Sequence, residues 1–193
     1  MAKFDPAYAV VVGLEGGYKA ADDVDAETIH GINREHNPNW KGWPLVDALK
    51  DNPGFPMRAN NDPEVFRLAK ERYRSGYWLL IAGDLLPEQE VATKLLDLAV
   101  HAGVRTAGKM LQETLNLLRR PHETPLYDAL LVDGVIGKKT VEAYRLLQEK
   151  DGPDKAGRYV MALLRGMQTQ FYIELASRMA YHSKNLRGYL RRV

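Results

Sequence analysis

The sequence contains no cysteine among its 193 residues. The chain therefore has no disulfide framework, and no thiolate can act as a nucleophile or as a soft metal ligand. A cysteine-free chain suits both a reducing cytoplasm and an oxidising cell wall, so this absence does not identify a compartment.

Long apolar runs are also missing. The first residues, Met1 to Pro6, lack the apolar core and small-residue cleavage site of a signal peptide. The most apolar stretch, residues 8–14, is far shorter than the roughly 20 residues that span a bilayer. We expect synthesis in the cytoplasm without a signal peptide and no stable membrane insertion, so a substrate outside the membrane would require an export route.

Motifs for metals and nucleotides are absent as well. None of the five histidines has the spacing of an HExxH-type site; they are His30, His36, His101, His122 and His182. The sequence also lacks a GxGxxG or GKS/GKT loop. We therefore expect no metal site and no cofactor.

What is present is the composition of a folded protein, with 45% hydrophobic and 27% charged residues. Apolar residues recur at helical spacing through most of the chain, which predicts an all-α fold. Residues 18–43 lack this period and are rich in turn formers, which predicts a loop region with a short hairpin near residues 28–33. We predict a loop-rich lobe over residues 1–86 and a helical lobe over residues 87–193.

Helix starts are marked by cap residues and prolines. Asp5 and Pro6 predict that the first helix opens with a cap and a proline, and the apolar residues 7–14 predict that nearly all of its faces are buried. Further helices are expected over residues 44–50, from 61–63, from Pro87, after Gly103, over residues 138–149 and from near Pro153. The last is expected to be the longest and to pack through the stripe Val160, Leu163, Leu164, Met167, Phe171 and Leu175.

Glu15 is the first candidate for chemistry, because it closes an apolar helix and two glycines follow it. The negative end of the helix dipole and apolar surroundings both favour the protonated carboxyl that a general acid needs. Gly16 and Gly17 leave room for a bulky polymer to approach. A surface glutamate at a glycine-capped helix end would have the same pattern.

A glycosidase needs a second carboxylate opposite its acid. Asp22, Asp23 and Asp25 lie in the polar loop that leads to Thr28. Spacing does not choose among them, and a solvated turn has the same composition.

Aromatic residues near this loop suit the apolar faces of sugar rings. Trp40 and Trp43 fit a sugar groove and core packing equally well, whereas Trp78 precedes an apolar run and is expected in the core. Tyr18 and Tyr77 are further candidates for the groove.

The run Leu14-Glu15-Gly16-Gly17-Tyr18, followed by Thr28-Ile29-His30-Gly31-Ile32, resembles the signature of glycoside hydrolase family 108. These are N-acetylmuramidases of phages and prophages, and some are labelled secretion activators. The resemblance continues through residues 73–78, 97–103, 111–112, 133–140 and 188–192, where the later segments resemble the family's peptidoglycan-binding region.

The resemblance implies a lysozyme-like N-terminal lobe and an endolysin-type hydrolysis of the β-1,4 bond between N-acetylmuramic acid and N-acetylglucosamine. Glu15 would be the general acid. Counting back from Thr28, Asp23 takes the place of the family aspartate with Asp22 beside it, and Thr28 would hold the water or the carboxylate.

The same resemblance suggests a set of substrate-binding residues, namely Tyr18, His30, Trp40, Trp43 and His101. The chain departs from the family pattern in this set. His30 stands where the family usually has a tyrosine, and His101 stands where it often has an asparagine. The loop before Thr28 is one residue shorter and lacks the family's paired glycines.

Two other functions remain open. A lytic transglycosylase would use one glutamate and release a 1,6-anhydro product, and a catalytically silent wall-binding or secretion-associated protein would keep only the fold. The expected partner is the peptidoglycan glycan strand, and a holin or other export partner is also expected. We expect no nucleic-acid partner and a monomeric chain. The three arginines in residues 187–193 suit anionic wall polymers, but they also suit a solvated helix end.

Overall fold

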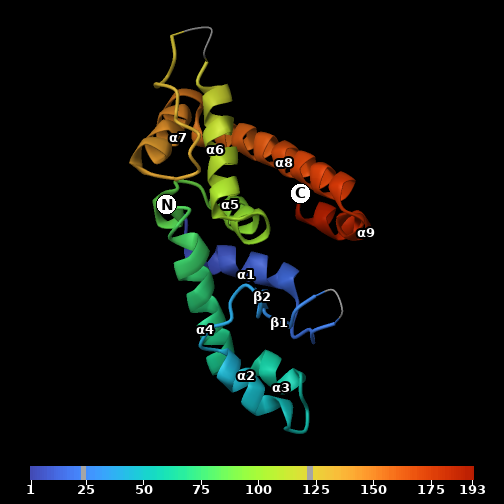
Figure 1. Cartoon of the computed structure of the whole chain (residues 1–193). Helices are drawn as coiled ribbons and strands as arrows, with labels where there is room; N and C mark the ends of the chain where they lie inside the picture. The colour runs from blue at the N-terminus through green and yellow to red at the C-terminus, as the bar shows by residue number, and fades with distance from the viewer. Residues whose placement is uncertain (23–24, 121–123) are drawn as a thin grey trace. The chain divides into compact units, whose positions relative to one another are not determined.

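The computed structural model describes residues 1–22, 25–120 and 124–193, without the side chains of Leu14, Glu15 and Ala180. The described chain is mainly α-helical with two very short strands, which confirms the predicted fold class (Figure 1). It divides into a small unit, Tyr8–Gly76, and a large unit, Met1–Ala7 with Tyr77–Val193. The domain limits predicted above, 1–86 and 87–193, stay a proposal. Among the described residues, no helix is both long and apolar enough to cross a lipid bilayer.

The small unit contains most of the first helix, a hairpin and three further helices. Its elements are α1 (Phe4–Glu15), β1 (Thr28–Ile29), β2 (Ile32–Asn33), α2 (Trp43–Lys50), α3 (Met57–Asn61) and α4 (Pro63–Tyr73). A π-helical segment, Arg74–Trp78, follows α4. Helix α2, predicted over residues 44–50, and helix α4, predicted to start at residues 61–63, are both present, whereas the five-residue α3 was not predicted.

The predicted hairpin is present. Thr28 pairs with Asn33 and Ile29 with Ile32, in antiparallel register. His30 and Gly31 form the two-residue turn, and both have positive φ, at 48° and 76°. Two positive φ values are the property of the tight turns that match the twist of a hairpin. This turn directs Ile29 and Ile32 into the core.

Helix α1 differs from its prediction in two ways. It begins at Phe4, so Asp5 lies inside the helix and is not its cap. It is also not buried all round, because Ala7, Tyr8 and Val11 are buried while Val10 is exposed. A helix at a surface buries one stripe only, and a run that is apolar on every face does not reveal which stripe that is.

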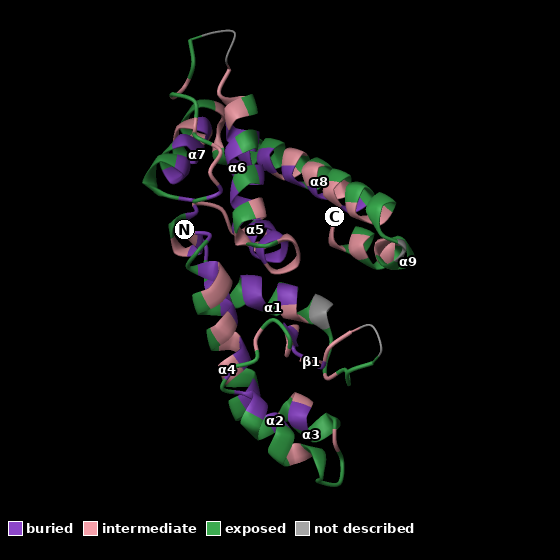
Figure 2. Ribbon diagram, viewed as in Figure 1, coloured by how far each residue is buried: buried purple, intermediate pink, exposed green. Residues whose placement is uncertain are grey.

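Helix α4 follows the predicted pattern. The Asp62 carboxylate accepts hydrogen bonds from the backbone N–H groups of Glu64 and Val65, at 3.0 and 2.9 Å, and caps the helix. The buried face carries Val65, Ala69 and Tyr73. Figure 2 shows such buried stripes along the helices of both units.

The large unit is a helical assembly around one long helix. Its elements are the 3-10 turn Gly83–Leu85, then α5 (Gln89–Ala102), α6 (Val104–Leu118), α7 (Lys138–Asp151), α8 (Pro153–Arg178), α9 (Ala180–Tyr189) and the 3-10 turn Leu190–Arg192. Helix α8 contacts α5, α6, α7 and α9 (Figure 1). Trp78 is fully buried in this unit, which confirms the core prediction for it.

The predicted stripe on α8 is right at its start and wrong toward its end. Val160 and Leu164 are buried, but the buried face continues through Gln168 and Tyr172, while Phe171 is only half-buried. Apolar periodicity does not detect a buried face that carries a glutamine and a tyrosine hydroxyl. Helix α9 was not predicted.

Candidate functional site

Glu15 is the last residue of α1, so it closes the helix as the sequence predicted. Its side chain and the whole of Asp23 lie outside the described residues. The roles of Glu15 as acid and of Asp23 as second carboxylate therefore stay predictions.

The backbone that follows Glu15 is held from α3. The N–H of Tyr18 donates to the Asn60 side-chain oxygen at 2.7 Å. A Cβ at Gly17 would lie 2.7 Å from the Asn60 amide nitrogen, so a side chain at that position would collide with the Asn60 side chain. We call the hydrogen bond from Tyr18 to this side chain the Asn60 clamp. Gly17 thus permits a close contact with Asn60, a reason for glycine that the sequence alone did not reveal.

The side chain of Tyr18 continues this contact on the other side. Its ring packs edge-on against Phe55, with 4.6 Å between ring centroids, and its hydroxyl donates to Glu27 Oε1 at 2.9 Å. Burial, together with the neighbouring Glu27 carboxylate, raises the pKa of the Tyr18 hydroxyl. Tyr18 therefore stays a neutral donor that joins the segment after Glu15 to Glu27.

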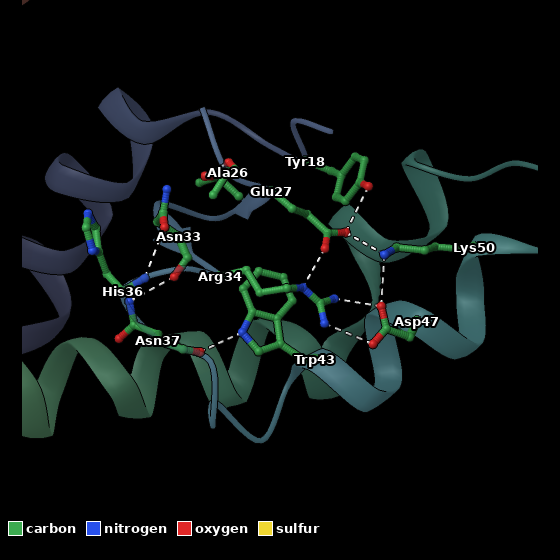
Figure 3. A network of polar contacts seen from close by, with 11 residues as sticks. Tyr18, Ala26, Glu27, Asn33, Arg34, His36, Asn37, Trp43, Asp47 and Lys50 are labelled. Carbon is green, nitrogen blue, oxygen red and sulfur yellow. Dashed lines mark hydrogen bonds and ion pairs between the residues drawn. The ribbon is translucent and has the colours of Figure 1, made fainter. Parts of the chain in front are cut away.

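Glu27 is a buried carboxylate, 7% exposed, at the centre of an ionic network (Figure 3). The Arg34 Nε atom lies 2.5 Å from Glu27 Oε2, and Lys50 Nζ lies 2.8 Å from Glu27 Oε1. Both cations also pair with Asp47, at 2.6 and 2.9 Å. Burial alone would raise the pKa of Glu27, but Lys50, Tyr18 and Arg34 together hold that pKa below its ordinary value. Glu27 is therefore an ionised structural group.

The loop that carries the aspartates is closed by a backbone bridge. Lys19 and Thr28 exchange two hydrogen bonds, with N–O distances of 2.8 and 2.9 Å. The Lys19 ammonium lies 3.6 Å from the exposed Asp22 carboxylate and 2.5 Å from Asp25, whose backbone N–H also donates to Asp22. The Thr28 hydroxyl donates to the Ala26 carbonyl at 3.1 Å. The catalytic roles of Asp22 and Thr28 stay predictions.

His30 lies in the hairpin turn and is 8% exposed. Its Nε2 atom is buried and has no hydrogen-bond partner in the described part of the chain. Burial lowers the pKa of the ring, against a hydrogen bond with the Asn60 backbone. Asn60 therefore contacts both the turn and the segment after Glu15. Substrate binding by His30 and Tyr18 stays a prediction.

Trp40 and Trp43 are both buried and pack edge to face, 5.1 Å apart. Each indole N–H donates to a backbone carbonyl, that of Leu68 for Trp40 and that of Asn37 for Trp43. Trp43 also lies under the Arg34 guanidinium at 4.1 Å. Trp40 alone of the two lines a cavity of about 420 Å³. These contacts show core packing for both rings, and a sugar contact stays a prediction.

His101 belongs to the large unit, on the last turn of α5. Its ring packs edge-on against Tyr172 and Tyr189, at 5.3 and 4.9 Å. Burial and the nearby Arg192 lower its pKa to about 4, so the folded protein holds a neutral imidazole. Its role in substrate binding stays a prediction.

Two motifs that are far apart in the sequence meet around Asp97. Arg192 Nη1 lies 2.7 Å from Asp97 Oδ1, and the Gln168 amide donates to Asp97 Oδ2 at 3.1 Å. Lys94 is buried beside them and donates to Gln168 and to the Arg192 carbonyl. The sequence predicted that Arg192 would bind an anionic polymer or lie in solvent. In the structure its guanidinium instead pairs with Asp97 within the large unit.

A second pair of motifs meets at Gln112. This buried side chain donates to Asp133 at 2.8 Å and to the Val135 carbonyl at 3.1 Å, and it accepts from the Gly134 N–H at 2.8 Å. It thereby holds the Asp133–Gly134 turn, which precedes α7.

Sequence reasoning missed most of the polar residues of these clusters, among them Asn60, Glu27, Arg34 and Gln168. Glu27 directly precedes Thr28, where the second motif run begins, so its position was a signal that could have been used. The other three have polar side chains whose partners are remote in sequence, and no local pattern marks them.

Comparisons with known proteins agree with these motifs. A family model described as glycosyl hydrolase 108 matches residues 8–103, and a model described as a predicted peptidoglycan domain matches residues 106–193. Among solved structures, that of Brucella abortus SagA is 26% identical, covers 97% of this chain and 95% of its own, and has a TM-score of 0.51. A comparison with curated proteins returns no match.

Proposed function

The chain belongs to the glycosyl hydrolase 108 family, and from this premise we propose that it is an N-acetylmuramidase. The family assignment and the predicted peptidoglycan domain support a glycoside hydrolase that acts on peptidoglycan. The proposed reaction is hydrolysis of the β-1,4 bond between N-acetylmuramic acid and N-acetylglucosamine.

In the proposed mechanism Glu15 protonates the glycosidic oxygen while an oxocarbenium-like transition state develops. Asp23, or Asp22 beside it, activates water or supports the cation, and Thr28 orients that water or carboxylate. The observation that carries this proposal is the Asn60 clamp on Tyr18, because it holds the backbone directly after the proposed acid. This hydrogen bond supports the proposal because a general acid acts only when the backbone that carries it is held in place.

The experiment is digestion of purified peptidoglycan by the whole chain and by Glu15→Gln. Glu35→Gln is the matched control, because Glu35 is exposed and lies in the same unit. We expect lysis by the parent and the control and none by Glu15→Gln, with an unchanged or higher melting temperature. Glu15→Gln retaining a tenth of the activity would refute the assignment.

Mass spectrometry of the products distinguishes hydrolysis from the lytic transglycosylase reaction, which is the first alternative. A muramidase leaves reducing N-acetylmuramic acid ends, whereas a lytic transglycosylase leaves 1,6-anhydro ends. Anhydro products would replace the proposed reaction with the transglycosylase one.

A catalytically silent wall-binding or secretion-associated protein is the second alternative. The observation that favours it is that Lys19 pairs with both Asp22 and Asp25, so these two carboxylates are already engaged within the loop. A parent protein that binds sacculi but releases no muropeptide would establish this alternative.

We further propose that the protein acts on the wall after synthesis in the cytoplasm and release or export. The large unit would assist by binding peptidoglycan, in line with the matched domain. Co-sedimentation of full-length Glu15→Gln with purified sacculi tests this wall binding without digestion of the ligand.

A further inference from the structure

The large unit contains a cavity that none of the proposed catalytic residues lines. Its volume is about 840 Å³, against about 420 and 470 Å³ for two cavities of the small unit. It lies between residues 127–137 and the first turns of α7, with Gln112 of α6 also in its wall. Its volume falls within the range that binding sites for small molecules occupy.

One part of the cavity wall is apolar. Leu130, Leu131, Val135 and Leu146 contribute to it, and Leu131 and Val135 are 78% and 66% exposed. Two large apolar side chains that project into solvent beside a cavity provide a surface for small apolar groups of a ligand.

The start of α7 contributes positive charge to the cavity wall. Gly137 is the N-cap residue, and no side chain caps the helix. The first backbone N–H groups of a helix attract anions, and Lys138 and Lys139 line the cavity at this place.

Thr140 adds a polar group to the cavity wall. The residue is 2% exposed and lines the cavity, and no side chain or backbone group among the described residues forms a hydrogen bond with its hydroxyl. The hydroxyl is therefore open to the cavity, where it can donate to a ligand group or accept from one.

Acidic side chains line the same cavity. Asp128 and Glu142 are exposed there, whereas the Asp133 carboxylate is already engaged by Gln112 and by the Val135 N–H. The cavity therefore offers cations and helix N–H groups for carboxylates, carboxylates for an amine, and an apolar wall for methyl and methylene groups.

We propose that this cavity binds the stem peptide of peptidoglycan. A stem peptide with a diamino acid combines carboxylates, an amine and alanine methyl groups in a short chain, which is the set that the wall of the cavity complements. A bare glycan strand has methyl groups and lactyl carboxylates but no amine, so the amine is what distinguishes the stem peptide. The inference rests on the proposed function, because it names the part of peptidoglycan that the large unit recognises.

The test uses full-length Glu15→Gln, so that no turnover occurs, and the synthetic tripeptide L-Ala-γ-D-Glu-meso-diaminopimelate as the probe. Calorimetry should detect binding. Lys138→Gln with Lys139→Gln should weaken it about tenfold, since each replacement removes a charge-assisted contact. Arg145→Gln with Lys150→Gln is the matched control: it makes the same charge change on α7 at residues that do not line the cavity.

Thr140→Val removes the hydroxyl and keeps the shape of the side chain. We expect about fivefold weaker binding of the tripeptide and an unchanged or higher melting temperature, because no described hydrogen bond is lost. A lower melting temperature with unchanged binding would show a structural hydroxyl and overturn the proposal.

Two further outcomes would also overturn it. One is equal binding of inorganic phosphate and the tripeptide, which would show a general anion site. The other is no tripeptide binding while the protein still binds glycan strands stripped of peptides; the muramidase proposal would survive that result and the stem-peptide site would not.

Discussion

The side-chain oxygen of Asn60 lies 2.7 Å from the backbone nitrogen of Tyr18, three residues after Glu15. A residue from the short helix α3 thereby holds the chain at the end of the helix that carries the proposed acid. Asn60 also contacts His30 through its backbone. The hairpin turn and the end of α1 thus share one support.

Replacement of Asn60 tests this support. Asn60→Ala should reduce peptidoglycan hydrolysis about tenfold or more, because small misplacements of a catalytic group are costly. The loss of one hydrogen bond should lower the free energy of unfolding by only about 1 kcal/mol. Asn60→Asp retains an acceptor and should restore most activity, and Asn61→Ala, on the exposed neighbour, is the control. Full activity of Asn60→Ala would contradict a positioning role.

Replacement of Glu27 should cost stability. Glu27→Gln leaves Arg34 and Lys50 with Asp47 as their remaining partner in the network, and we expect a loss of about 2 kcal/mol in the free energy of unfolding. Denaturant titration measures this loss, with Glu35→Gln as the exposed control.

The pH dependence of stability, compared between the parent and Glu27→Gln, tests whether the ionised Glu27 carboxylate stabilises the fold. The pKa of Glu27 is lowered from its ordinary 4.5, so its stabilisation is present above that pH and is lost as the pH falls through the lower folded value. The difference between parent and Glu27→Gln should therefore shrink in acid. A difference that stays constant below pH 4.5 would argue against stabilisation by the ionised carboxylate.

His101 predicts a second pH effect. The folded protein holds it neutral with a pKa of about 4, whereas the unfolded chain takes up a proton below about 6.5. Its contribution should therefore reduce stability as the pH falls from 6.5 to about 4, by up to about 3 kcal/mol. His101→Asn should flatten the stability curve in this window, with a remainder from His30. NMR titration of the His101 ring measures the folded pKa directly.

Arg192 and its neighbour provide a matched pair. Arg192→Gln removes the 2.7 Å ion pair with buried Asp97 and leaves Lys94 at 3.7 Å, so we expect a loss of about 2 kcal/mol. Arg191 is exposed, and Arg191→Gln should change the melting temperature very little. Equal effects of the two variants would exclude a specific anchor at Arg192.

Local patterns in the sequence predicted much of the fold. Asp62 and Pro63 marked the start of α4, and Thr28 to Asn33 gave the hairpin, because caps and tight turns depend on neighbouring residues. Helix α3 was missed, since five residues are too few to establish a helical period.

The candidate site was less accessible from sequence. The family-like run located Glu15 and Thr28, but the partners that hold the surrounding backbone are remote, as Asn60 is from Tyr18. The same limit applies in the large unit. Asp97 and Arg192 were both part of motifs, yet their pairing depends on how the helices pack.

The bridge between Lys19 and Thr28 separates two segments that should differ in their tolerance of length change. The two ends of the segment between Lys19 and Thr28 are tied together, so insertions between them should cost little stability, and related chains should vary in length at this point. The two-residue turn at His30 and Gly31 has no such freedom. One added or deleted residue would shift the strand register and turn Ile29 or Ile32 toward water, so selection should keep the length of this turn constant.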